Sequence, residues 1–178
     1  MRLVVTQVAG LGISTWVPID SLKNPMSVGL GLYFSNGAVA TAKVQHTFDT
    51  YSDSAKRTNI SISRSTTTAT VTDTGHGLSV GDSALINNSG SSVLDGYQTV
   101  VSVIDANNYT YTCANSGPAA SVLGVCSWNF RVFDHSTLTG KSARADGNYA
   151  YNVSMVRLNV TAFTSGVVYL DILQGGPL

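Results

Sequence analysis

Short runs of alternating apolar and polar residues recur along the whole chain. Side chains of a β-strand point to opposite faces in turn, so a period of two indicates strands with one buried face. No stretch keeps apolar residues at i, i+3, i+4 and i+7 over the roughly ten residues that a helix needs. We therefore predict an all-β protein with strands at residues 3–8, 15–18, 26–34, 38–47, 59–64, 66–73, 83–86, 97–104, 109–113, 122–128, 130–133, 148–153, 155–162 and 167–174.

Two of the predicted turns have the residues of a β-hairpin. At Ser35–Gly37 the Asn-Gly step supplies the positive φ angles that a tight two-residue turn requires. Residues 156–174 alternate almost strictly on both sides of Thr164–Gly166. Each turn is therefore expected to join two strands that pair with one another.

The hydrophobic pattern stops at Thr50–Arg57, a polar segment of the kind that separates folding units. Beyond it, five or six short strands in about 70 residues are typical of a small β-barrel or β-sandwich. Residues 44–49 and 128–135 are predicted to be neighbouring ends of one sheet. We thus expect a discontinuous β-sandwich or jelly-roll-like domain, residues 1–57 plus 127–178, with an inserted β module at residues 58–126.

Charge and hydropathy exclude two classes of partner. Ten basic and ten acidic residues give a formal net charge of zero, so the electrostatic footprint of nucleic-acid binding is missing. No run approaches the roughly 18 to 20 apolar residues that span a bilayer, and residues 1–16 do not have the build of a signal peptide. Only 11% of residues are charged, which predicts a Ser/Thr/Asn/Gly surface suited to lateral association.

Chemistry-bearing residues are few, and no catalytic, cofactor-binding or metal-binding residue is predicted. No G-x-S-x-G nucleophile elbow occurs, and every acidic residue is an Asp, several of them in turn positions. His46, Asp49, Asp134 and His135 could in principle converge on a divalent ion from paired strands. Strand alternation, however, places His46 and Asp49 on opposite faces. We expect a protein that is not an enzyme and that has no cofactor.

Two smaller residue groups leave alternatives open. Cys113 and Cys126 flank a loop and either form a disulfide across a hairpin or lie buried as two small side chains. Tyr109 and Tyr111 share a strand face and, with Tyr97, either pack in a core or interface, which is favoured, or present a carbohydrate-binding surface. His76, in a Gly-His-Gly turn, is expected to position its loop.

The stretch Thr70–Asp82, which contains GHGLSVGD, and the stretch Asp95–Tyr111, with its DGYQTV and DANNYTY segments, have a recognisable build. Together they resemble a β module that recurs in bacteriophage tail and head structural proteins, to which no catalytic role attaches. Physically, the three glycines of the turn permit a close bend, two apolar residues point into the core, and the closing acid can cap backbone N–H groups. These residues are Gly75, Gly77 and Gly81, then Leu78 and Val80, then Asp82.

Residues 156–175 are similar to the C-terminal hairpin of small phage virion proteins that fold as β-sandwiches or jelly rolls. The two resemblances imply a virion structural protein, assembled in the host cytoplasm. The first expectation is a capsid decoration, or cement, protein that binds the major capsid protein and itself as a homo-oligomer, of which a trimer is one candidate form. The alternatives are a tail, neck or fibre component, including a carbohydrate-binding adhesin.

Overall fold

The computed structural model describes residues 2–20, 27–52, 55–114 and 121–175, without the side chains of residues 59 and 121–126. Within these ranges it contains sixteen β-strands, all paired antiparallel, and no α-helix, which confirms the predicted all-β class. No helix in the described ranges is long and apolar enough to cross a membrane.

The chain divides into two compact units: an outer unit of residues 1–48 and 133–178, and an inserted unit of residues 49–132. The expected junctions, 57/58 and 126/127, instead fall inside strands β6 (Lys56–Ser65) and β12 (Ser121–Phe130). Polar residues around Arg57 interrupt the hydrophobic pattern without ending the strand, because Arg57 pairs with Ser127 in the β6–β12 ladder.

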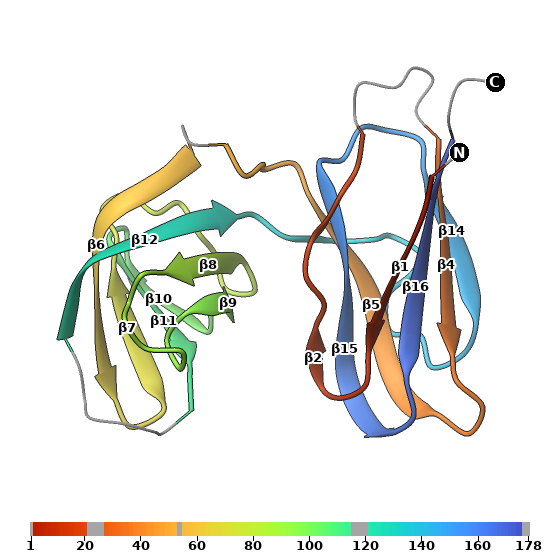
Figure 1. Ribbon diagram of the computed structural model, residues 1–178, viewed down its shortest axis with the longest axis horizontal. Helices are drawn as coiled ribbons and strands as arrows, with labels where there is room; N and C mark the ends of the chain where they lie inside the picture. The colour runs from red at the N-terminus through yellow and green to blue at the C-terminus, as the bar shows by residue number, and fades with distance from the viewer. Residues whose placement is uncertain (1, 21–26, 53–54, 115–120, 176–178) are drawn as a thin grey trace. The chain divides into compact units, whose positions relative to one another are not determined.

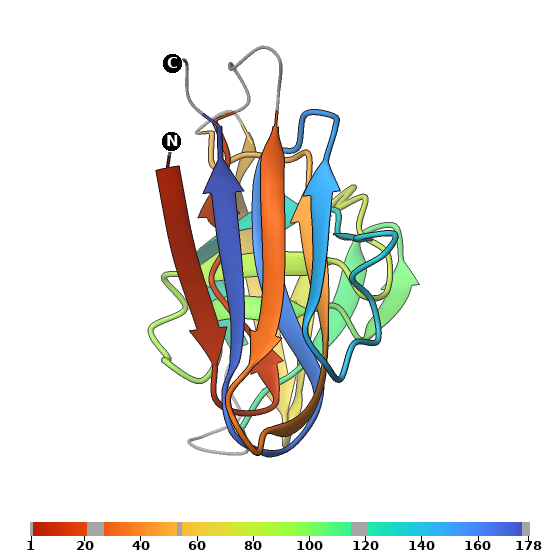
Figure 2. The same cartoon turned by 90° about the vertical axis from the view of Figure 1, so that its right-hand side faces the viewer.

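Two sheets form the outer unit (Figures 1 and 2). The first sheet has the order β1 (Arg2–Val8), β16 (Val168–Gln174), β4 (Val28–Phe34), β14 (Ala145–Tyr149). The second has the order β13 (Phe133–Asp134), β5 (Val39–Thr47), β15 (Met155–Ser165), β2 (Gly12–Ile13), and β3 (Val17–Pro18) also pairs with β15. Alternate residues of both sheets fill one core, so this unit is β-sandwich-like, as predicted.

Neither predicted hairpin is a hairpin. The Ser35–Gly37 turn joins β4 of the first sheet to β5 of the second, and the turn at Gly166 joins β15 of the second sheet to β16 of the first. The strands and turns were located correctly, but each turn crosses the sandwich as an arch. Each strand buries its apolar face against the opposite sheet. Alternation and turn residues alone do not show whether two strands joined by a turn pair in one sheet or lie in opposite sheets.

The two arches are joined by hydrogen bonds. The Ser35 N–H donates to the Val167 carbonyl at 2.9 Å, and the Val167 N–H donates to Ser35 Oγ at 2.9 Å. Gly166 has φ +93°, and a Cβ there would lie 2.4 Å from Ala38 Cβ. Glycine is therefore required at this contact, both for its backbone angle and for space.

A single curled seven-stranded sheet forms the inserted unit (Figure 1). Its order is β10 (Ser102–Asp105), β11 (Asn108–Thr112), β7 (Thr68–Thr72), β6, β12, β8 (Ser83–Asn87), β9 (Gly96–Thr99). The two edge strands follow one another in sequence, since the predicted strand 97–104 is split at Val100–Val101. No ladder among the described residues joins β9 to β10, so the sheet is not a closed barrel.

Candidate functional site

The four predicted polar residues His46, Asp49, Asp134 and His135 do not form one site. His46, Asp134 and His135 belong to the outer unit and Asp49 to the inserted unit. His135 positions a loop, since its ring accepts from the Leu138 N–H at 3.3 Å and its other nitrogen meets the Asn148 carbonyl. Among the described residues, no group of three or more His, Cys, Asp or Glu side chains could hold a metal ion.

The two acids of this set have other partners. Asp134 accepts hydrogen bonds from Lys43 Nζ at 2.9 Å and from Gln45 Nε2 at 2.8 Å. Partial burial acts to raise the pKa of Asp134, but these bonds and the Lys43 charge outweigh it and hold the pKa below its usual value. Asp49 is bound by Arg131, whose Nη2 lies 2.7 Å from Asp49 Oδ1.

His46 lies under a cluster of aromatic rings at one end of the sandwich core. Four rings surround it with centroids 5.1 to 5.9 Å away: those of Phe48, Phe133, Tyr149 and Tyr151. Burial, then the neighbouring His135, lower the pKa of His46. Its Nδ1 is buried and has no hydrogen-bond partner among the described residues, so the neutral ring is favoured.

Three rings of this cluster are exposed: Phe48 by 47%, Phe133 by 45% and Tyr151 by 51%. We call these three residues the aromatic patch. The sequence hypothesis had considered Tyr97, Tyr109 and Tyr111 instead, but Tyr109 and Tyr111 are fully buried in the inserted unit, as the core-packing alternative expected. Spacing along the chain does not reveal the patch, because its residues come from three separate segments.

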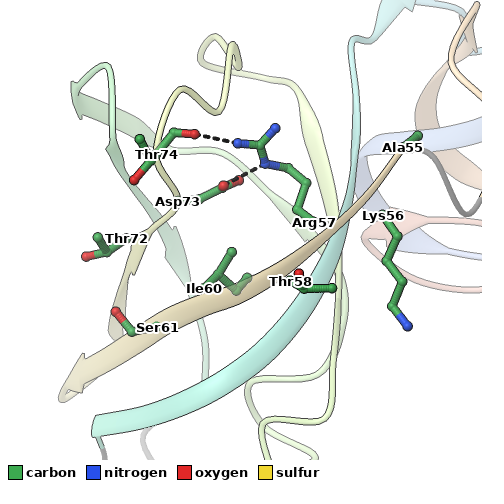
Figure 3. Close-up of a pocket in the computed structure, with 9 residues that line it drawn as sticks. All are labelled: Ala55, Lys56, Arg57, Thr58, Ile60, Ser61, Thr72, Asp73 and Thr74. Atoms are coloured by element: carbon green, nitrogen blue, oxygen red, sulfur yellow. Dashed lines mark hydrogen bonds and ion pairs between the residues drawn. The ribbon is translucent and has the colours of Figure 1, made fainter.

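A cleft of about 460 Å³ opens in the inserted unit where β6 and β7 separate (Figure 3). The ladder between these strands ends at the pair Ser61 and Thr72, and the preceding residues of β6 curve away toward β12. The cleft is lined by Ala55, Lys56, Arg57, Thr58, Ile60, Ser61, Thr72, Asp73 and Thr74. Four of these nine residues carry hydroxyl groups, and none of the nine is a histidine or a cysteine.

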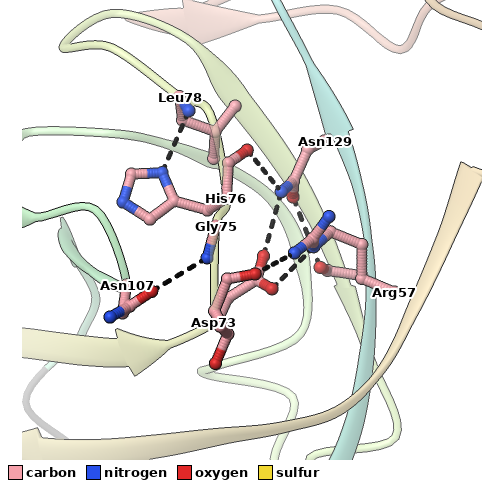
Figure 4. A network of polar contacts seen from close by, with 9 residues as sticks. Arg57, Asp73, Gly75, His76, Leu78, Asn107 and Asn129 are labelled. Carbon is pink, nitrogen blue, oxygen red and sulfur yellow. Dashed lines mark hydrogen bonds and ion pairs between the residues drawn. The ribbon is translucent and has the colours of Figure 1, made fainter.

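The single carboxylate of the cleft is engaged. Arg57 Nε donates to Asp73 Oδ1 at 2.6 Å, and the other Asp73 oxygen accepts from Asn129 Nδ2 at 3.0 Å (Figure 4). Arg57 also donates to the Thr74 carbonyl. Asp73 is almost fully buried, and both of its carboxylate oxygens accept hydrogen bonds from side chains.

The turn after β7 is held by side chains that bind backbone groups (Figure 4). His76 Nδ1 accepts from the Leu78 N–H at 2.9 Å, so its Nε2 carries the proton and donates to the Asp105 carbonyl at 3.0 Å. Asn107 Oδ1 accepts from the Gly75 N–H at 3.0 Å. His76 therefore positions this loop, as the sequence indicated.

The GHGLSVGD segment follows its expected conformation in all but one residue. Gly75, Gly77 and Gly81 have positive φ, and Asp82 accepts from the backbone N–H groups of Ser79 and Val132, which confirms the predicted turn and cap. Leu78 is buried, but Val80 is 66% exposed and does not point into the core. The chain turns back at residues 79–82, so Val80 lies at the turn and not along a strand.

Cys113 is a buried free thiol. The side chain of Cys126 lies outside the described part of the chain.

Figure 2 shows the first sheet in front, and its outer face is the one that points away from the core of the outer unit. Strand register places its outward residues in three rows across β14, β4, β16 and β1. The rows are Asn148, Gly29, Leu173, Leu3; then Asp146, Gly31, Asp171, Val5; then Tyr33, Tyr169, Gln7. Leu3 is 59%, Val5 51% and Leu173 40% exposed, and the Tyr33 and Tyr169 rings stack with centroids 4.7 Å apart. We call this surface the outer face.

Two charged residues, Asp171 and Arg144, act on the Tyr33 ring of the outer face. Asp171 Oδ1 is buried and has no hydrogen-bond partner among the described residues. Desolvation and then the Asp171 charge raise the pKa of Tyr33, while Arg144, which precedes β14, acts in the opposite direction. Both charges thus act on the same ring, yet within the described ranges no ion pair joins them. Sequence alternation could have indicated this face, but only knowledge of the strand order assembles its rows.

Comparison with known proteins gives limited similarity. No protein-family model matches the sequence, and no curated protein matches it significantly. Among solved structures, this chain is similar to phage phi92 endosialidase with a TM-score of 0.36 and 27% identity. The match covers 57% of this chain and 17% of the endosialidase chain, so this chain spans a small part of that protein's length. At this TM-score the likeness supports no conclusion about fold or function.

Proposed function

We propose that this protein is a non-enzymatic structural protein of a bacteriophage virion. In its most specific form the proposal is a capsid decoration, or cement, protein that binds the major capsid protein and further copies of itself. It would be located in the virion after assembly in the host cytoplasm. It requires no cofactor, nucleic acid or membrane.

The observation that carries this proposal is the outer face. Leu3, Val5 and Leu173 expose apolar side chains on the outer face, next to the polar outward residues of β14. Burying apolar surface against a lattice is favourable by about 25 cal/mol per Å², and many equivalent contacts add up over a shell. The resemblance of residues 70–82, 95–111 and 156–175 to phage virion modules supports the same proposal.

The test is the number of copies per particle. Purified virions are separated by gel electrophoresis, and the band of this protein is quantified against the major capsid protein. A ratio on the scale of the capsid lattice supports decoration, whereas a ratio that matches one neck or tail ring moves the protein there. Absence from purified virions would contradict the proposal as a whole.

The aromatic patch favours a second candidate, a fibre-type adhesin that binds carbohydrate. Phe48, Phe133 and Tyr151 offer exposed ring faces of the kind on which sugar rings stack. A glycan array probed with the full chain should then give binding that Tyr151→Ala weakens and Tyr51→Ala, an exposed aromatic of the inserted unit, leaves unchanged. An array without signal would eliminate this candidate.

A further inference from the structure

Two glycines in the middle of β4 are not explained by the packing of the outer unit. Gly29 and Gly31 face outward, neither has a positive φ, and a Cβ at Gly31 would meet its nearest atom, Asp171 Cβ, at an ordinary 3.6 Å. Glycine within a strand costs about 0.5–1 kcal/mol relative to alanine. Such glycines mark positions that another backbone or ligand approaches closely.

The charges around these glycines are self-complementary. Register places Gly31 between Asp146 on β14 and Asp171 on β16, so two carboxylates flank a position without a side chain. Arg144, which directly precedes β14 and is close enough to act on the Tyr33 ring of this face, is exposed and forms no ion pair among the described residues. An arginine from a partner, laid over Gly31, would reach both carboxylates, and this face itself supplies such an arginine.

We propose that the outer face binds the outer face of a second copy of this chain, with Arg144 of each copy lying over Gly31 of the other and pairing with its Asp171. The contact is isologous, so the two copies are related by a twofold axis and each arginine–carboxylate pair occurs twice. It buries Leu3, Val5 and Leu173 of both copies. The inference rests on the proposed function and specifies its self-association: the outer face is assigned to a second copy and not to the capsid protein.

The size of the face sets the expected strength. Four strands about 4.8 Å apart and about seven residues long cover roughly 19 by 23 Å, or about 440 Å². A standard stable interface buries about 800 Å² on each partner. The pair is therefore weak in solution and depends on concentration, which suits a contact that forms on a crowded shell. A twofold contact accounts for pairs and does not by itself make the trimer considered from the sequence.

Charge reversal in the full chain tests the pairing. Arg144→Glu and Asp171→Lys should each weaken self-association by about tenfold or more, measured by sedimentation equilibrium, because like charges then face each other twice. The two single variants mixed in equal amounts should associate about as tightly as the wild type, since every 144–171 contact between them joins opposite charges. Lys141→Glu has the same charge change as Arg144→Glu but lies next to β5 of the second sheet, and should have no effect.

A steric variant separates this inference from the proposed function. Gly31→Leu has space within its own chain and should keep the β-sheet circular dichroism spectrum, but it should abolish self-association. A wild type that stays monomeric at millimolar concentration, or a mixture of charge variants that fails to associate, overturns the second copy as partner. If Gly31→Leu also fails to bind particles while the wild type is monomeric, the face contacts the capsid protein, and only the self-pairing is overturned. The proposed function fails independently, by absence from virions.

Discussion

The outer and inserted units reach a buried core by different means. In the outer unit two sheets bury alternate residues against each other, and two turns cross between the sheets as stacked arches. In the inserted unit one sheet curls around its core. His76 and Asp82 hold its turns by accepting hydrogen bonds from backbone N–H groups, and the buried Asp73 carboxylate accepts from the Arg57 and Asn129 side chains. Both units have a hydrophobic core, to which the outer unit adds the close contact between its arches and the inserted unit adds the buried contacts of Asp73.

This difference predicts which substitutions damage each unit. Added volume should be most harmful where the arches of the outer unit touch, and lost hydrogen bonds should be most harmful in the inserted unit. The two tryptophans of the chain allow separate measurement, because Trp16 lies in the outer unit and Trp128 in the inserted unit. Fluorescence in urea follows the outer unit in a Trp128→Phe background and the inserted unit in a Trp16→Phe background.

The largest effect is expected for Gly166→Ala in the outer unit. The new Cβ would lie 2.4 Å from Ala38 Cβ, and the φ of +93° is strained for any L-residue. Overpacking and backbone strain together should lower the free energy of unfolding by about 3 to 5 kcal/mol, read from the Trp16 transition. Gly37→Ala is the matched control, since its φ is +74° but nothing lies within 4 Å, and it should cost about 1 kcal/mol. Equal losses would show that the arches do not touch closely.

These arches also show where sequence reasoning reaches its limit. Alternation located β4, β5, β15 and β16, and the turn residues located Ser35–Gly37 and Gly166. Whether two strands joined by a turn pair with each other or lie in opposite sheets depends on which other strands each of them pairs with. In this protein β16 pairs with β4 and β15 with β5, which are contacts far apart in the chain. Local pattern does not contain that information.

The candidate sites follow the same rule. The turn glycines and the Asp82 cap were predictable because they act within a few residues of sequence. The aromatic patch and the outer face were not predicted, because each brings together residues from separate segments of the chain. The prediction that Val80 points into the core was wrong for a related reason. A turn at residues 79–82 ends the alternation before Val80, so this side chain is exposed.

A smaller but still large effect is expected for Asp73→Ala in the inserted unit. The substitution leaves Arg57 and Asn129 without their buried acceptor, although partial exposure of Arg57 lets water solvate part of its charge. The Trp128 transition should show a loss of about 2 to 3 kcal/mol. Lys43→Met removes the more exposed Lys43–Asp134 pair of the outer unit and should cost less than about 1 kcal/mol. If both substitutions cost the same, polar contacts do not distinguish the two units.

Two buried tyrosines of the inserted unit test how much one hydroxyl hydrogen bond contributes to stability. Tyr111 Oη donates to the Leu94 carbonyl at 2.9 Å, whereas Tyr109 Oη is buried without a partner in the described part of the chain. Tyr111→Phe should therefore cost about 1 kcal/mol, and Tyr109→Phe should cost nothing or stabilise the unit slightly. Because both rings are fully buried and stay in place, urea midpoints of the two variants compare hydrogen bonding at nearly constant packing. The opposite order of stabilities would contradict the reading.

The smallest effect concerns pH and returns to the outer unit. Because burial lowers the pKa of His46, the unfolded chain binds a proton near the ordinary value of 6.5 before the folded chain does. Stability is therefore fully present above pH 6.5 and is lost as pH falls toward the folded pKa, with a slope that cannot exceed about 1.4 kcal/mol per pH unit for one proton.

His46→Phe, which keeps a ring among Phe48, Phe133, Tyr149 and Tyr151, should reduce the difference between the Trp16 transitions at pH 7.5 and at pH 5.5. His135 and Asp134 are present in both proteins, so the change between wild type and variant isolates His46. An unchanged pH dependence would mean that the packed rings of the outer unit impose no cost on a buried charge, which would weaken its contrast with the inserted unit.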